Sequence, residues 1–190
     1  MVSVRRSTGQ QREPAGYAPV PMIYRLAQTD DSEAIRSIYN REVLSSTATF
    51  DMVARAPEDQ LAWMDEHSGA HPAVVAVDDD GRVRGFGSLS PWRPRPAYRT
   101  SVEDSVYVDP DAQGRGVGKG LLGELVRLAG SHGFHAVMAR IVGGHEASIA
   151  LHKSCGFEAV GIEREVGRKF GRWLDVVIME LLIDAAQNGS

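Results

Sequence analysis

Gln113-Gly114-Arg115-Gly116-Val117-Gly118 is a glycine-rich segment that joins two segments of different periodicity. Residues 102–108 before it are predicted to form a strand, and residues 121–128 after it carry leucines at helical spacing. Glycines let backbone amides approach a ligand, and the positive end of the helix dipole lies behind them. The turn therefore predicts a pyrophosphate site to which Arg115 and Lys119 add charge, although glycines also occur in ordinary flexible connections.

Two other phosphate motifs compete for the same residues. A Walker A loop needs a glycine five residues before the Gly118-Lys119 pair and a Ser or Thr after it, but Gln113 and Gly120 occupy those positions. The dinucleotide fingerprint G-x-G-x-x-G does occur, but it lies inside the helical leucine pattern, and residues 138–145 lack the acid it requires. Both alternatives are therefore disfavoured.

The remaining segments predict an α/β protein with a mixed sheet covered by helices. Asp30 and Asp31 are expected to cap the first helix, and Pro57 to begin the second. The Pro-rich residues 91–96 are expected to form a loop. The other predicted helices are the one that bears Leu121, Leu125 and Leu128 and the one from Glu146 to Ser154. The predicted strands are Met22 to Leu26, the hairpin Ala73 to Val77 with Arg82 to Leu89, Val102 to Val108, His135 to Val142, Glu158 to Val166 and Trp173 to Leu182.

Length and composition limit the possible classes of protein. The 190 residues suit one domain, here expected over 22–184, between a disordered N-terminal tail at 1–21 and a flexible C-terminus at 185–190. A net charge of -4 argues against a general binder of nucleic acid or membranes. Cys155 is the single cysteine, so no intrachain disulfide can form and the cytoplasm is the expected compartment. No apolar run is long enough to cross a membrane.

A family resemblance extends from Met22 to about Leu182. Gln-x-x-Gly-x-Gly between a strand and a helix resembles the acetyl-CoA pyrophosphate loop of the GNAT acetyltransferases. The match also includes Ile38-Tyr39-Asn40, Thr49-Phe50, Pro91-Trp92-Arg93, Ser101-Val102-Glu103, Val106-Tyr107-Val108 and Ser148 to Phe157. A further segment, Lys169-Phe170-Gly171-Arg172-Trp173-Leu174-Asp175, resembles the phosphinothricin and methionine sulfoximine or sulfone acetyltransferase branch. Leu174 stands where some phosphinothricin enzymes have His, which favours the methionine sulfoximine and sulfone group.

The resemblance implies a GNAT fold, with a mostly antiparallel mixed sheet of about seven strands, helices on both faces, and a gap between splayed fourth and fifth strands. Acetyl-CoA is the implied cosubstrate, no metal is expected, and a homodimer is implied. The implied acetyl-CoA contacts are Val106, Tyr107, Val108, Gln113, Gly114, Arg115, Gly116, Val117, Gly118, Lys119, His145 and Ser154. The implied substrate contacts are Phe50, Trp92, Arg93, Arg95, Arg99, Ser101 and Val102. Arginine suits a carboxylate or phosphinate because its planar fork can donate two parallel hydrogen bonds.

The implied reaction is direct attack of an α-amino group of a small amino-acid analogue on the thioester. Glu103 matches the branch's general base, and we expect it to act through water. Many family members carry a Tyr where this chain has His152, so either His152 or Tyr107 is a candidate for the general acid. Direct attack needs no enzyme nucleophile, and Cys155 is expected to pack as a small apolar residue. The alternatives are a protein N-terminal or polyamine acetyltransferase and a non-catalytic CoA-binding regulatory module.

Overall fold

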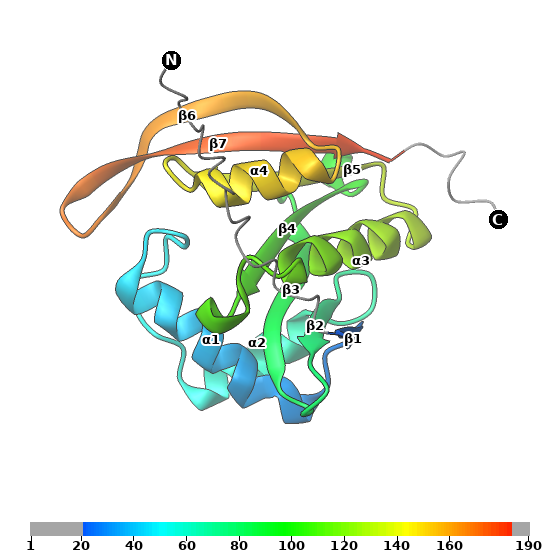
Figure 1. Ribbon diagram of the computed structural model, residues 1–190. Coiled ribbons are helices and arrows are strands. Elements are labelled where there is room, and N and C mark those ends of the chain that lie inside the picture. The colour runs from blue at the N-terminus through cyan, green and yellow to red at the C-terminus, as the bar shows by residue number, and fades with distance from the viewer. Residues whose placement is uncertain (1–20, 184–190) are drawn as a thin grey trace, which may run out of the picture.

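The computed structural model describes residues 21–183 and shows one open sheet with helices on both faces (Figure 1). The predicted tail at 1–21 and the predicted C-terminus at 185–190 lie outside the described residues, except Pro21. The strands are β1 (Ile23–Leu26), β2 (Ala73–Val77), β3 (Val83–Pro91), β4 (Ser101–Val108), β5 (Ala136–Val142), β6 (Glu158–Lys169) and β7 (Arg172–Leu182). The helices are α1 (Ser32–Ser45), α2 (Pro57–Glu66), α3 (Val117–Ser131) and α4 (Glu146–Ser154), with short 3-10 turns η1 (Thr29–Asp31), η2 (Pro96–Tyr98) and η3 (Pro110–Ala112).

The strands follow the order β1-β2-β3-β4-β5-β7-β6, and each neighbouring pair is antiparallel except β4 and β5. The parallel pair is short, because β4 and β5 are in register only from Ser101 and Ala136 to Glu103 and Met138. Beyond Glu103 the two strands separate. The predicted fold, with its splayed fourth and fifth strands, is confirmed.

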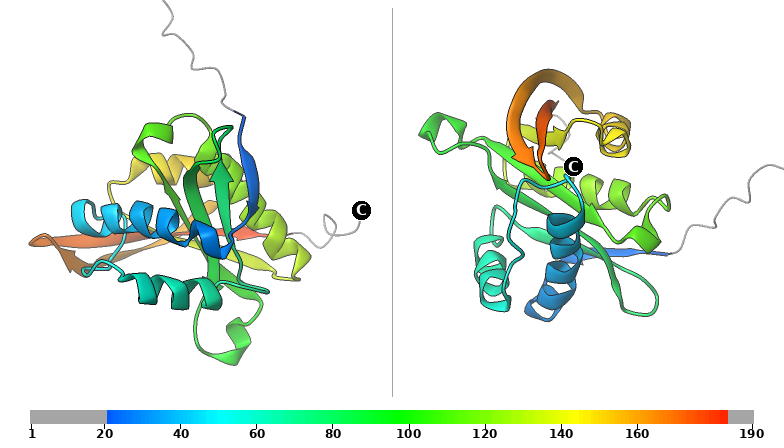
Figure 2. Two further views of the ribbon diagram at one scale, coloured as in Figure 1. Left: turned by 90° about the horizontal axis from the view of Figure 1, so that it is seen from below. Right: turned by 90° about the vertical axis from the view of Figure 1, so that its left-hand side faces the viewer.

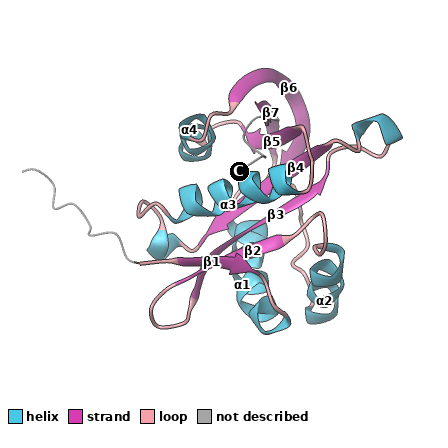
Figure 3. Cartoon of the chain, turned by 90° about the vertical axis from the view of Figure 1, so that its right-hand side faces the viewer, coloured by secondary structure: helices cyan, strands magenta, loops and turns pink. Residues whose placement is uncertain are grey.

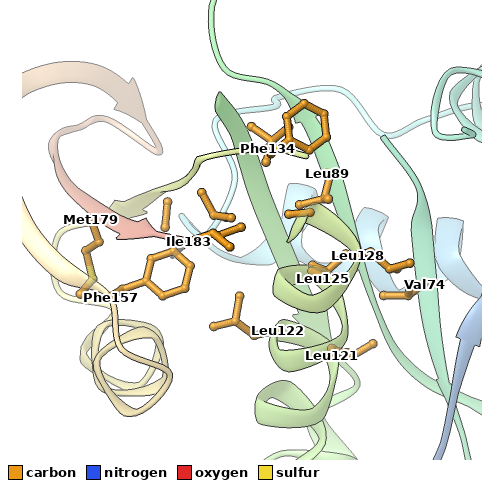
Figure 4. Close-up of a cluster of buried hydrophobic side chains, with 14 of the residues drawn as sticks. Val74, Leu89, Leu121, Leu122, Leu125, Leu128, Phe134, Phe157, Met179 and Ile183 are labelled. Atoms are coloured by element: carbon orange, nitrogen blue, oxygen red, sulfur yellow. The ribbon is translucent and has the colours of Figure 1, made fainter. Parts of the chain in front are cut away.

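Helices cover the two faces of the sheet in pairs, with α3 and α4 on one side and α1 and α2 on the other (Figure 3). Views from below and from the side show the same two layers (Figure 2). On the α3 face, the predicted leucine stripe of α3 packs with Leu89, Phe157 and Met179 (Figure 4). On the α1 face, Ile35 and Phe86 belong to a second buried cluster. The core on the α3 face includes Val102 of β4 and Val137 of β5, so it holds both strands that border the gap.

Some predicted boundaries differ from the observed ones. The strand β6 continues three residues past Val166 to Lys169, and β3 continues to Pro91, where the ladder with β4 ends. The capping prediction for Asp31 is wrong: its carboxylate accepts the Gln28 amide at 2.7 Å and pairs with Arg25 at 2.6 Å, so it stabilises the turn before α1. Within 21–183, no helix has both the length and the apolar character needed to span a bilayer.

Candidate active site

A cavity of about 530 Å³ lies where β4 and β5 separate. Its walls come from Asp104 to Val108 on β4, from Ala139 to Val142 on β5, from the start of α3 and from one side of α4, and Glu42 and Ala48 complete them. Backbone amides and carbonyls of β4 in this region have no neighbouring strand on the β5 side. The gap therefore offers hydrogen-bonding groups to an extended ligand in place of a strand.

The glycine turn forms one end of this cavity. Gly114 and Gly116 have φ angles of +72° and +83°, and Gly116 is the N-cap residue of α3. A Cβ atom at Gly118 would lie 3.1 Å from the side chain of Leu151, so the turn and α4 approach closely there. The residues of the predicted cofactor loop that line the cavity are Gln113, Gly114, Gly116, Val117, Gly118 and Lys119. This end of the cavity has the geometry of an anion site at a helix N-terminus.

The remaining predicted cofactor residues divide into two groups. Val106, Tyr107, Val108 and His145 line the cavity. His145 Nε2 lies 2.9 Å from Thr47 Oγ1, which links the start of α4 to the loop after α1. Arg115 and Ser154 do not line the cavity; the Ser154 hydroxyl donates to the Leu151 carbonyl at 2.7 Å.

Glu103 lies at the closed end of the gap, as the last β4 residue paired with β5. Its side chain is mostly buried, and this burial raises the pKa of Glu103 to about 7 although Arg140 acts in the opposite direction. Asp104 and Glu163 raise the pKa further. A carboxyl group with this pKa exists in both protonation states near neutral pH, as a general base requires.

The predicted substrate residues are not brought together in one pocket. Phe50 packs against Gly167, where an added Cβ would lie 2.3 Å from the Phe50 ring. Arg93 lies over the rings of Trp92 and Tyr98, in an exposed loop that also carries Arg95 and Arg99. Ser101 is half-buried next to this loop, and the side chain of Val102 is fully buried in the core, which leaves only its backbone for a ligand.

Tyr107 and His152, the two candidates for the general acid, have different surroundings. The Tyr107 ring contacts Tyr39 and Phe86 in the α1 cluster, with ring centroids 5.2 Å from each, and burial strongly raises the pKa of Tyr107. His152 lies on the opposite face, where its Nε2 is 3.1 Å from Asp104 Oδ2. The sequence reasoning did not identify Asp104 as a partner.

Arg140 is another residue of the site that the sequence reasoning missed. It lines the cavity from β5 and lies 3.3 Å from Glu163 of β6. Arg140 meets Glu163 only because β5 pairs with β7 and β7 pairs with β6, and the sequence pattern alone does not predict this strand order. The signal that could have found it is its position: it is the only charged residue in an otherwise apolar strand, Ala136–Val142.

Cys155 lies outside this site. It is a free, partly buried thiol that packs against the α3 core and does not line the cavity. This position agrees with the prediction that it packs as a small apolar residue.

An α/β sheet that opens between two parallel strands, above a glycine turn and a helix N-terminus, is the architecture of an acyl-CoA-dependent acyltransferase. The model of the acetyltransferase (GNAT) family matches residues 33–157. The chain belongs to this family and is an acetyl-CoA-dependent N-acetyltransferase.

Named relatives and solved structures agree with this assignment. The chain is 40% identical over 159 residues to an L-methionine sulfoximine/L-methionine sulfone acetyltransferase of Pseudomonas paraeruginosa, covering 83% of this chain and 92% of the relative. A phosphinothricin acetyltransferase from Sinorhizobium meliloti, solved in complex with AcCoA, is 40% identical with a TM-score of 0.81, covering 85% of this chain and 88% of that one. A ribosomal-protein-alanine N-acetyltransferase from Brucella melitensis is 38% identical with a TM-score of 0.82, covering 85% and 99%.

Proposed function

We propose that this enzyme acetylates the α-amino group of a small amino-acid analogue of the methionine sulfoximine, methionine sulfone or phosphinothricin type. The proposal is carried by the position of Glu103 at the closed end of the gap, where burial raises the pKa of its carboxyl group to about 7. The relatives named for methionine sulfoximine and phosphinothricin acetylation support the substrate class.

The residues of the gap suit an acetyl-CoA molecule with its pantetheine arm between β4 and β5. The backbone of Val106 to Val108 would bond to the arm, because this part of β4 has no partner strand in β5. The amides at the start of α3, with Lys119 beside them, would hold the diphosphate. A β4 amide near Glu103 would polarise the thioester carbonyl, as backbone donors do in acyl transfer.

Glu103 is assigned the role of general base. An ammonium group has no lone pair for attack, so the substrate amine must lose a proton first. Glu103 would accept this proton through a water molecule, because it is the last β4 residue paired with β5 and directly precedes Asp104 in the cavity wall. Near neutral pH a substantial fraction of Glu103 is ionised and able to accept it.

A CoA-release assay tests the substrate assignment. The panel contains methionine sulfone, methionine sulfoximine, phosphinothricin, ordinary amino acids, spermidine and a peptide that begins with alanine. We expect the highest kcat/KM with one of the three amino-acid analogues. A preference for spermidine would contradict the assignment, and absence of thiol release with every amine would favour a non-catalytic module.

The alanine peptide tests a second candidate function, protein N-terminal acetylation. This candidate is favoured by the similarity to the Brucella melitensis ribosomal-protein-alanine N-acetyltransferase. An amino-acid analogue and a protein N-terminus both present an α-amino group, so Glu103 could serve either acceptor. They differ beyond that group, because a peptide needs an open groove. The ratio of the two kcat/KM values decides between them.

We also propose that the enzyme is a cytoplasmic homodimer. The single cysteine supports a reducing compartment. The long hairpin of β6 and β7 lies at one edge of the sheet (Figure 1) and supports dimerisation, because Ile162, Phe170 and Trp173 are each more than half exposed on it. Apolar side chains gathered on one element are typical of a surface that a protein partner covers.

A further inference from the structure

Arg140 is a charged residue of the gap to which the function proposed above gives no role. It is the one exposed residue of β5, and 39% of its side chain is accessible to solvent. Ala139 and Ile141 on either side of it belong to the core on the α3 face, so the Arg140 side chain points to the opposite face of the sheet. Because Arg140 also lines the cavity, a guanidinium borders the gap on the side away from α3.

Glu103 lies on the same face of the sheet as Arg140. Val102, its neighbour in β4, belongs to the α3 core, so Glu103 also points away from α3. Met138, the ladder partner of Glu103, precedes Arg140 by two residues, which is about 7 Å along a strand. Burial raises the pKa of Glu103 and Arg140 acts against this effect, so the two groups are close enough to interact.

The protein uses only part of the hydrogen-bonding capacity of the Arg140 guanidinium. Within residues 21–183, its hydrogen bond is to Glu163 of β6, where Nη2 lies 3.3 Å from Oε2. This contact is long for a charge-assisted hydrogen bond. A guanidinium carries N–H donors on each of its three nitrogens. Glu163 therefore holds the group in place, and most of the N–H donors remain available to a ligand.

An α-amino acid needs a cation close to the base that takes its amine proton. The amine and the carboxylate are bonded to the same carbon atom, so a site that holds the amine beside Glu103 holds the carboxylate nearby. Without a cation, that carboxylate would be repelled by Glu103 and Glu163. Among the described residues, Arg140 is the arginine that lines the cavity, whereas Arg93 lies over aromatic rings in an exposed loop.

We propose that Arg140 binds the α-carboxylate of a free amino-acid acceptor and thereby selects free amino acids over peptides and polyamines, an inference that rests on the acetyl transfer proposed above. A carboxylate can accept two parallel hydrogen bonds from the planar fork. A peptide N-terminus presents an uncharged amide at this position, which offers one acceptor oxygen. Spermidine presents a further ammonium group, which accepts no hydrogen bond and is repelled by the guanidinium.

The test compares two acceptors that differ in this one charge. They are methionine sulfone and its neutral carboxamide, or the corresponding pair for whichever analogue the panel above favours. The carboxamide has a less basic amine, so kcat/KM is expressed per unprotonated amine. The wild type should prefer the carboxylate, and Arg140→Met should reduce this preference by about 30-fold, within the range for a hydrogen bond to a charged group. Most of the change should appear in the KM for the carboxylate acceptor.

The ratio between the two acceptors isolates the carboxylate contact. Arg140→Met also changes the environment of Glu103, but that effect is common to both acceptors and cancels in the ratio. Arg140→Lys should keep part of the preference, because lysine retains the charge but not the planar fork.

Arg127→Met is the matched control. Arg127 is likewise an arginine paired with a glutamate, Glu124, at 2.7 Å, but it lies on α3 and does not line the cavity. This variant should keep the wild-type preference for the carboxylate.

An unchanged preference in Arg140→Met would overturn the proposal. So would a wild type that acetylates the carboxamide as readily as the carboxylate, a result that needs no variant to fold. Loss of the preference in Arg93→Met but not in Arg140→Met would assign the carboxylate to the arginine loop and would also refute this role of Arg140. A wild type that acetylates no amine would instead remove the proposed function.

Discussion

Glu103 shows how a single residue acquires its chemistry from its position in the strand. Glu103 is the last residue of the ladder between β4 and β5, so its carboxyl group is shielded by the sheet while the next residue, Asp104, lines the cavity. Burial disfavours the charged form and raises the pKa to about 7. The nearby guanidinium of Arg140 limits this increase.

Glu103→Gln should lower kcat/KM for the amine by about 100-fold, because the amide cannot accept the proton. In the wild type, kcat/KM should rise with pH through about 7 as Glu103 ionises. This limb should be absent in Glu103→Gln, while the titration of the substrate amine itself remains. Calorimetry should show unchanged acetyl-CoA affinity. Glu158→Gln, on an exposed residue of β6, is the control and should retain activity; equal rates for Glu103→Gln and the wild type would rule out this base.

The same substitution should change stability in a pH-dependent way. The folded state raises the pKa of Glu103 from 4.5 to about 7, so it binds the proton more tightly than the unfolded chain does. Wild-type stability contributed by this proton is complete below about pH 4.5 and is lost as the pH rises through about 7. Glu103→Gln has no such loss. Its melting temperature, measured without acetyl-CoA, should exceed that of the wild type at pH 8 by more than it does at pH 5.

At the level of helices and strands, Gly116 in the turn before α3 meets two requirements, a left-handed backbone conformation and close approach to the cavity. Gly116 has a φ of +83° as the N-cap of α3, and it also lines the cavity. No atom lies within 4 Å of the position that a Cβ would take there. A side chain would therefore fit sterically in the free protein, but it would strain the backbone and lie against the bound diphosphate.

Gly116→Ala should reduce the free energy of unfolding by about 1 kcal/mol, the cost of a left-handed conformation for alanine. It should also raise the KM for acetyl-CoA severalfold. Gly81→Ala is the matched control, because Gly81 has a φ of +78°, equally open surroundings and a position in the turn between β2 and β3. It should lose similar stability and keep its KM. An equal KM for the two variants would contradict the role of Gly116 in binding.

The elements were largely predictable because each has a local cause. The turn at 78–81 predicts the hairpin of β2 and β3, and the leucine stripe predicts α3. The Asp104–His152 contact was not predictable, because it joins two elements 48 residues apart across the gap. The sequence pattern also does not predict where Arg93 lies, because a proline-rich loop can either fold over the gap or extend from it. The substrate pocket therefore remains a prediction from resemblance.

At the scale of the whole molecule, the hairpin of β6 and β7 is the main unexplained surface. It exposes Ile162, Phe170 and Trp173, whereas β2, which lies between β1 and β3, is fully buried. A solvent-exposed tryptophan on an extended hairpin has a hydrophobic cost that a second copy of the chain would remove.

Trp173→Lys should convert the proposed dimer into a monomer, because a buried unpaired ammonium at an interface is costly. Light scattering after size exclusion should give twice the mass of one chain for the wild type and the mass of one chain for the variant. Leu44→Lys is the control: Leu44 is 65% exposed, similar to the 61% of Trp173, but lies on α1. A monomeric wild type would exclude the dimer.

The separation of β4 and β5 has a further consequence for handling the protein. Beyond Glu103, the backbone amide and carbonyl groups with which β4 and β5 face each other are not paired in a ladder, which resembles a sheet edge capable of recruiting another polypeptide. Occupancy by coenzyme A would cover these groups and also favour the native state by mass action. Samples stored with coenzyme A should aggregate more slowly on warming than samples without it, as turbidity would record.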